Sequence, residues 1–209
     1  MARPESVAKA GYYPTPPSVV ERVSALIRQA SHSPRQAVRL LDPCCGTLHT
    51  LGPATLLVAP KTALFCSARS PGAAILRAHD AARHLRDEGV TVISGFHSPL
   101  EKECLRILLR GTQPILICLA RAMPKTPVLG ECRSAFEDGR ILFLSPFETT
   151  PRRVTRASAI RRNDIVAALA DEVFIANVTP GGETERLRAR LQTWGVSLIA
   201  TPDDSARVV

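Results

Sequence analysis

The stretch 91–111 constrains the fold of this chain more than any other part of the sequence. It begins with a short β-branched run, passes through a glycine-containing turn and continues as a strongly periodic helical pattern. Ser98 is placed to cap this helix, because Pro99 occupies the first helical position and Glu101 completes a capping box. A buried strand that leads into a capped helix is typical of an α/β fold. The turn between them points unpaired N–H groups at the loop, where they attract anions such as phosphate.

The same alternation of apolar runs and helix-length patterns extends over most of the chain. Strands are expected at 63–66, 91–93, 114–119, 141–144, 172–177 and 196–200, with helical segments between them. This order predicts a Rossmann-like, doubly wound and mostly parallel sheet over 61–209, with residues 1–60 as a short N-terminal extension. Ligands of such sheets bind beyond the carboxyl ends of the strands, where the strand order reverses.

Two helices carry more specific expectations. The helix expected over 73–87 should turn Ile75, Leu76, His79, Ala82 and Leu85, or positions near them, inward. An arginine-rich stretch is expected to lead into the next helix at Arg161, Arg162 and Asn163, with Asn163 as a candidate cap. A run of arginines is often only a solvated face, but arginine also binds phosphate oxygens through two parallel hydrogen bonds.

Composition narrows the classes of partner and compartment. The chain has 27 Lys and Arg against 19 Asp and Glu, a formal charge of +8 that suits a polyanionic partner. Six cysteines without a signal peptide indicate reduced thiols in the cytoplasm, and Cys66, Cys104 and Cys118 are expected in the core. No apolar run is long enough to span a membrane. Cys44, Cys45 and His49 do not have zinc spacing, so no metal is expected.

The beginning of the chain resembles one known family. The sequence PTPP at 14–17, an expected helix capped by Ser18, and LLDPCCG at 40–46 are similar to the front end of the DNA adenine amino-methyltransferases. The resemblance implies that the turn at 42–46 descends from one that holds S-adenosylmethionine. The Asn/Asp-Pro-Pro-Tyr motif that handles the target amine does not occur in the sequence, so this segment is interpreted as a truncated or vestigial methyltransferase start.

A longer resemblance covers about 140 residues. The segments ALFCSARSPG at 63–72, VISGFHSPLEKECL at 92–105, ILFLSPF at 141–147 and the stretch that begins AIRRNDIV at 159 look like the Rossmann-like domain of the DprA/Smf family. These are DNA-processing proteins that bind single-stranded DNA. The residues that match the family's binding loops are Ser67, Arg69, Ser94, Gly95, Arg161, Arg162, Asn163, Gly181 and Gly182.

The segment TPGGETE at 179–185 resembles the Pro-Gly-Gly-x-Gly-Thr motif of the LOG-type phosphoribohydrolases of the same superfamily. The resemblance implies a phosphate contact by Gly181, Gly182 and the hydroxyl of Thr184. His97 and Ser98 complete the candidate site in the turn after the second strand. His97 could act as a general base, but no nucleophile with an orienting partner can be placed beside it, so it is interpreted as a ligand contact.

Together, these features predict a domain that binds single-stranded DNA or nucleotide phosphates without a catalytic step of its own. A LOG-type nucleotide sensor or phosphoribohydrolase is the alternative, and a vestigial S-adenosylmethionine-dependent methyltransferase is a third interpretation. No cofactor is expected apart from a bound nucleotide. The expected partners are a DNA strand or nucleotide and further copies of the chain, with no membrane, in the cytoplasm.

Overall fold

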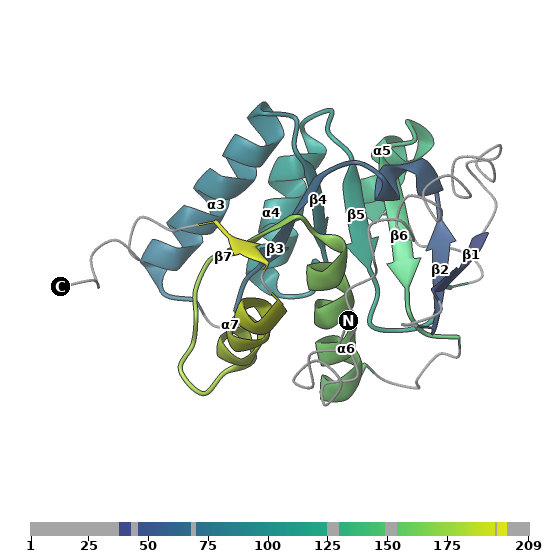
Figure 1. Cartoon of the computed structure of the whole chain (residues 1–209). Coiled ribbons are helices and arrows are strands. Elements are labelled where there is room, and N and C mark those ends of the chain that lie inside the picture. The colour runs from purple at the N-terminus through teal and green to yellow at the C-terminus, as the bar shows by residue number, and fades with distance from the viewer. Residues whose placement is uncertain are drawn as a thin grey trace, which may run out of the picture.

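The computed structural model describes residues 38–42, 46–67, 70–124, 130–148, 154–194 and 196–199. Strands and helices alternate from β3 onward, as the sequence predicts (Figure 1). In chain order the elements are β1 (Val38–Asp42), β2 (Gly46–Leu51), the 3-10 helix η1 (Ala54–Leu57), β3 (Lys61–Phe65), α3 (Gly72–Asp87), β4 (Thr91–Ser94), α4 (Pro99–Leu109), β5 (Ile115–Cys118), the 3-10 helix η2 (Gly130–Cys132), α5 (Arg133–Glu137), β6 (Ile141–Ser145), α6 (Arg156–Leu169), β7 (Glu172–Ile175), α7 (Glu183–Trp194) and β8 (Ser197–Leu198).

The described strands form one sheet in the order β1-β2-β6-β5-β4-β3-β7-β8. Every pair from β6 through β8 is parallel, whereas β1–β2 and β2–β6 are antiparallel. From β3 the chain moves outward through β4 and β5 to β6 and then returns to the other side of β3 with β7. The predicted doubly wound, mostly parallel sheet is therefore confirmed, and its strand order reverses between β3 and β7.

The hairpin formed by β1 and β2 lengthens the sheet at the β6 side. Its second strand pairs with β6, for example His49 with Ser145. The described part of segment 1–60 therefore belongs to the same sheet as the rest of the chain. The remainder of the methyltransferase-like segment, including the Pro-rich lead-in, the helix expected after Ser18 and most of the turn at 42–46, lies outside the described residues.

Helices cover both faces of the sheet (Figure 1). Helices α3, α4 and α5 pack on one face, and α6 and α7 pack on the other. Strand β5 serves both cores, because Ile115 and Ile117 face the first layer while Leu116 and Cys118 face the second. Cys66 and Cys104 are also buried, as predicted. No helix of the described part is long and apolar enough to cross a membrane.

The start of α4 is confirmed and the expected start of α6 is wrong. The Ser98 hydroxyl accepts the Glu101 N–H at 3.2 Å, and the Glu101 carboxylate accepts the Ser98 N–H at 3.1 Å. Helix α6 instead begins at Arg156, because Thr155 caps it and forms a capping box with Ser158. The expected cap Asn163 consequently lies inside this helix, together with Arg161 and Arg162.

Helix α3 buries only part of the expected stripe. Leu76 is 65% exposed, so its predicted inward position is wrong, and His79 is only partly buried. Ala82 and Leu85 are buried, as predicted, and Ile75 is partly buried; the other buried positions are Ala74 and Ala78. Small alanine side chains allow this helix to lie close against the sheet and α4, which favours burial of the alanines over burial of the bulkier Leu76.

Candidate phosphate-binding pocket at the switch point

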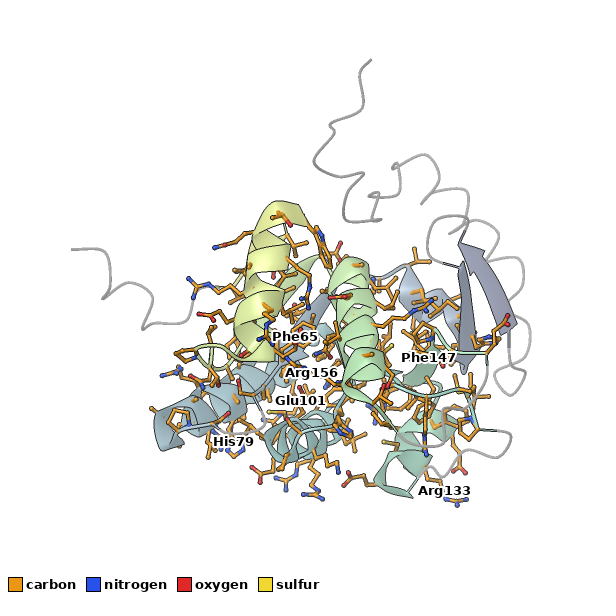
Figure 2. All side chains as sticks on the ribbon, turned by 90° about the horizontal axis from the view of Figure 1, so that it is seen from below. Phe65, His79, Glu101, Arg133, Phe147 and Arg156 are labelled. Atoms are coloured by element: carbon orange, nitrogen blue, oxygen red, sulfur yellow. The ribbon has the colours of Figure 1, made fainter. Side chains whose placement is uncertain are left out.

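A pocket of about 390 Å³ lies beyond the carboxyl ends of β3 and β4, beside the point where the strand order reverses. Figure 2 looks onto this edge of the sheet and labels Phe65 and Glu101 of the lining. The complete lining is Phe65, Cys66, Ser67, His97, Ser98, Glu101, Arg162, Asn163, Thr179, Gly182, Glu183, Thr184 and Leu187. Its volume lies in the lower part of the range typical of small-ligand sites.

Most of the site residues predicted from the sequence meet in this pocket. The predicted residues that line it are Ser67, His97, Ser98, Arg162, Asn163, Gly182 and Thr184. Ser94, Gly95, Arg161 and Gly181 do not line it. Arg69 lies outside the described residues. Three turns, which follow β3, β4 and β7, thus converge with helix α6, as expected for loops that follow the strands of a doubly wound sheet.

Ser94 and Gly95 support the pocket from beneath. Ser94 is completely buried, and its hydroxyl donates to the Leu64 carbonyl at 2.7 Å, which ties β4 to β3. Gly95 lies directly against the side chain of Arg162, where a Cβ atom would overlap the guanidinium group. The glycine is required here because of this close approach, and its role is to make room for Arg162.

Glu101 occupies the anion position at the N-terminus of α4. One carboxylate oxygen accepts the Cys66 N–H at 3.2 Å, and the other accepts the His97 N–H at 2.8 Å and the Ser98 N–H. The residue is 6% exposed. The sequence predicts that the N–H groups of this turn attract a phosphate. In the structure they donate their hydrogen bonds to the chain's own Glu101 carboxylate instead.

Three hydroxyl groups join β3, the loop after β7 and α7. The Ser67 hydroxyl donates to the Asn177 carbonyl at 3.0 Å and accepts from the Thr179 hydroxyl at 3.1 Å. It also lies 3.1 Å from the Thr184 hydroxyl, which accepts the Thr179 N–H. A ligand anion can receive a hydrogen bond from this cluster only if one internal hydrogen bond is exchanged, because each hydroxyl carries one proton.

The acidic side chain at the start of α7 is neutralised by arginines. Glu183 accepts from Arg190 at 3.0 Å and lies 3.6 Å from Arg186 and 3.8 Å from Arg156. Arg190 also donates to Asp164 at 3.0 Å, which links α7 to α6. Burial raises the pKa of Asp164, and Arg190 opposes that shift. Arg156 is therefore engaged in an ion pair.

Arg162 lines the pocket, and no acidic side chain among the described residues forms an ion pair with it. It is 6% exposed, and its Nε donates to the Asn163 side-chain oxygen at 2.9 Å. Within the described ranges, no carboxylate forms an ion pair with its guanidinium group. A guanidinium held in a pocket with its terminal nitrogens unpaired is suited to two parallel hydrogen bonds with a phosphate or carboxylate.

The other two predicted residues face away from the pocket. Arg161 is exposed, and its guanidinium carbon lies 5.7 Å from the centre of the Phe147 ring. Gly181 is exposed with φ +67°, and its N–H donates to Glu185 at 2.8 Å. Glycine suits this left-handed turn, which brings Gly182 and Thr184 into the lining.

The thiol groups near the pocket are poor nucleophiles. A hydrogen bond to Cys104, together with burial, raises the pKa of Cys66. Burial raises the pKa of Cys118 to about 12, although Arg162 acts in the opposite direction. Both groups are therefore neutral near pH 7, where a nucleophilic cysteine would need to be a thiolate. In the described part of the chain, no group of three or more His, Cys, Asp or Glu side chains could hold a metal ion.

Sequence reasoning missed several lining residues. These are Phe65, Cys66, Glu101, Thr179, Glu183 and Leu187. Thr179 directly precedes the Pro-Gly-Gly segment, so the motif itself could have indicated it. Glu101 was interpreted only as a capping residue, and its second oxygen reaches across to the loop after β3. That contact depends on how α4 packs beside β3, and the sequence around Glu101 does not indicate this packing.

Comparisons with known proteins agree with the fold. No protein-family model matches the chain, and no curated protein matches it. Among solved structures, the chain is similar to DNA processing protein A from Helicobacter pylori, which is described for its single-stranded DNA binding mode. The two share 19% identity and a TM-score of 0.63, and the match covers 78% of this chain and 80% of that chain. DNA processing protein A (DprA) from Streptococcus pneumoniae is similar with a TM-score of 0.62 and 15% identity, over 85% of this chain and 67% of that chain. At these identities the likeness shows that the chain has a DprA-like fold.

Proposed function

We propose that this chain is a DprA-like DNA-processing domain that binds the phosphates of single-stranded DNA at the switch-point pocket. The proposal rests on the buried guanidinium group of Arg162, which forms no ion pair with any of the described residues. The DprA-like fold adds support, because the Helicobacter pylori protein of this fold is described as binding single-stranded DNA.

The charges around the pocket support an anionic ligand. The carboxylate of Glu101 is stabilised by three backbone N–H groups, and that of Glu183 by three arginines. The negative charges of Glu101 and Glu183 are thus both stabilised by groups of the protein itself. The positive charge of Arg162 remains for a ligand, and the formal charge of +8 for the whole chain favours a polyanion.

The proposed mode of action is binding without a catalytic step. The Cys66 thiol is held in its protonated form, and both oxygens of the Glu101 carboxylate accept backbone hydrogen bonds. A general base needs a lone pair directed at the ligand, and a nucleophile needs to be activated. These two groups meet neither requirement, which supports a binding function.

A single nucleotide is the second candidate ligand. The observation in its favour is that Gly182 and Thr184, which belong to the segment that resembles the LOG-type phosphate motif, line the pocket. The hydroxyl cluster of Ser67, Thr179 and Thr184 lies at the same end of the pocket. A nucleotide would place its phosphate on Arg162 and occupy the pocket alone, without a strand that continues beyond it.

The test is a fluorescence-anisotropy titration of a labelled single-stranded oligonucleotide at two salt concentrations. The wild-type protein should bind, and log K should fall by about 0.7 per log unit of salt for each phosphate neutralised. Arg162→Ala should weaken binding at least about tenfold, since a hydrogen bond to a charged group contributes about 1.5–3 kcal/mol.

Arg110→Ala is the control, because Arg110 is an exposed arginine that caps the C-terminal end of α4, the end opposite to the pocket. It should retain wild-type affinity. A flat salt response, or equal losses in the two variants, would refute the strand-binding proposal. Saturable binding of a nucleoside monophosphate that depends on Arg162, with no strand binding at low salt, would instead establish the nucleotide pocket.

A further inference from the structure

Phe147 and Arg161 are in contact on the same edge of the sheet as the pocket. Phe147 follows β6 and is only partly buried, and Arg161 is an exposed residue of α6. The guanidinium carbon of Arg161 lies over the ring, 5.7 Å from its centre. This distance is typical of a cation–π contact. The pair is referred to below as the Phe147–Arg161 platform.

The aromatic side of the platform is held in place by β6. Ser145 is completely buried, and its hydroxyl donates to the Arg121 carbonyl at 2.7 Å and accepts the Phe147 N–H at 3.2 Å. The backbone that carries the Phe147 ring is therefore fixed to the loop after β5. A surface that is ordered before binding loses less entropy when a ligand is placed on it.

The platform lies close to the pocket but on the other side of α6. Figure 2 shows Phe147 on one flank of this helix and Phe65 and Glu101 on the other. Strands β4 and β6 are separated by β5 alone, so their ends are about 10 Å apart at the usual spacing of strands. Arg161 and Arg162 are consecutive in α6, and one contacts Phe147 while the other lines the pocket.

We propose that the Phe147–Arg161 platform stacks one base of a DNA strand whose phosphate is bound by Arg162. This inference rests on the proposed function. In this proposal the base stacks on the exposed guanidinium group of Arg161, which lies over the Phe147 ring. Bases stack on arginine planes and aromatic rings with little sequence preference, because every base has a π-face.

The test compares two strands of equal length, an oligothymidylate and a strand of abasic sites that keeps its phosphates. Arg161→Lys retains the positive charge but removes the flat surface. Arg110→Lys is the matched control at an exposed arginine far from the platform. Arg161→Lys should weaken oligothymidylate binding by about 5- to 150-fold, which corresponds to about 1–3 kcal/mol for one stacked base. It should leave the affinity for the abasic strand unchanged.

Phe147→Leu provides a second, uncharged variant and should also weaken only the binding of the base-bearing strand. Arg110→Lys should bind both strands as the wild type does. The platform is refuted if wild-type protein binds the two strands equally, or if Arg161→Lys and Phe147→Leu keep wild-type affinity for oligothymidylate. Binding of the abasic strand by wild-type protein would still support the phosphate site at Arg162. If wild-type protein binds neither strand, the proposed function fails and the platform fails with it.

Discussion

Replacing Gly95 by alanine probes the support of Arg162 directly. A Cβ atom at position 95 would overlap Nη1 and Cζ of Arg162 and would lie 2.6 Å from its Nε. The backbone of Gly95 has no left-handed φ, so the substitution creates no strain of its own there. The methyl group therefore acts on one neighbour, and the guanidinium group must leave its position over the loop.

The expected size of the effect follows from two separate costs. Adding a methyl group to a filled site lowers the free energy of unfolding by about 1–3 kcal/mol. A displaced Arg162 also loses its charged hydrogen bond to a phosphate, worth about 1.5–3 kcal/mol. Affinity for a single strand should then fall by about 10- to 150-fold, at about 1.4 kcal/mol for each factor of ten.

A double-mutant cycle with Arg162→Ala separates this reasoning from a direct ligand contact by Gly95. Urea unfolding and strand binding are measured for the wild type, both single variants and the double variant. In the Arg162→Ala background, Gly95→Ala should cost almost nothing in either measurement, because the overlapping atoms are absent. Gly72→Ala serves as the control, since nothing lies within 4 Å of its Cβ position. Equal losses in the two backgrounds would refute the idea that Gly95 acts through Arg162.

Two further predictions concern stability. Glu101→Gln should lower the free energy of unfolding, measured in urea, by about 1–3 kcal/mol. The reason is that an amide NH₂ cannot accept the hydrogen bonds from backbone N–H groups that a carboxylate oxygen accepts. An unchanged unfolding midpoint would contradict the role assigned to Glu101. Lys61→Met should be more stable than the wild type near pH 7, because burial, opposed by Asp171, lowers the pKa of Lys61 in the folded state. The wild type recovers stability as pH rises through that lowered pKa toward the unfolded value of 10.5, so the difference should shrink near pH 10; a difference that grows with pH would refute this sign.

The parts of the fold that could be predicted from the sequence are those determined by neighbouring residues. The box formed by Ser98 and Glu101 closes within four residues, so the sequence alone indicates where α4 begins. Apolar runs bounded by turns identify the strands for a similar reason, since each buried run needs no distant partner to be recognised. These two kinds of signal were sufficient for the doubly wound topology, because right-handed crossovers leave few other arrangements.

The predictions that failed depend on contacts between elements. The pattern of α3 places Ala82 and Leu85 inward correctly but also Leu76, and only the close packing against α4 and the sheet shows that Ala74 and Ala78 are buried in place of Leu76. Likewise, the Thr155 and Ser158 cap is weaker as a pattern than the arginine run that follows it, so the start of α6 was placed too late. Local signals compete in such cases, and the packing of the whole helix decides between them.

The candidate site shows the same division between what neighbours determine and what packing determines. The turns after the strands had to meet at one edge, and Ser67, His97 and Thr184 do meet there. The sequence could not show that Arg161 is exposed while Arg162 is buried, because successive helix residues differ by about 100° and the register of α6 was unknown. Nor could the total charge of +8 identify which cation is left for a ligand. To identify that cation, the ion pairs of all the described residues must be known. Glu101 is stabilised by backbone N–H groups and Glu183 by other arginines, so neither forms an ion pair with Arg162.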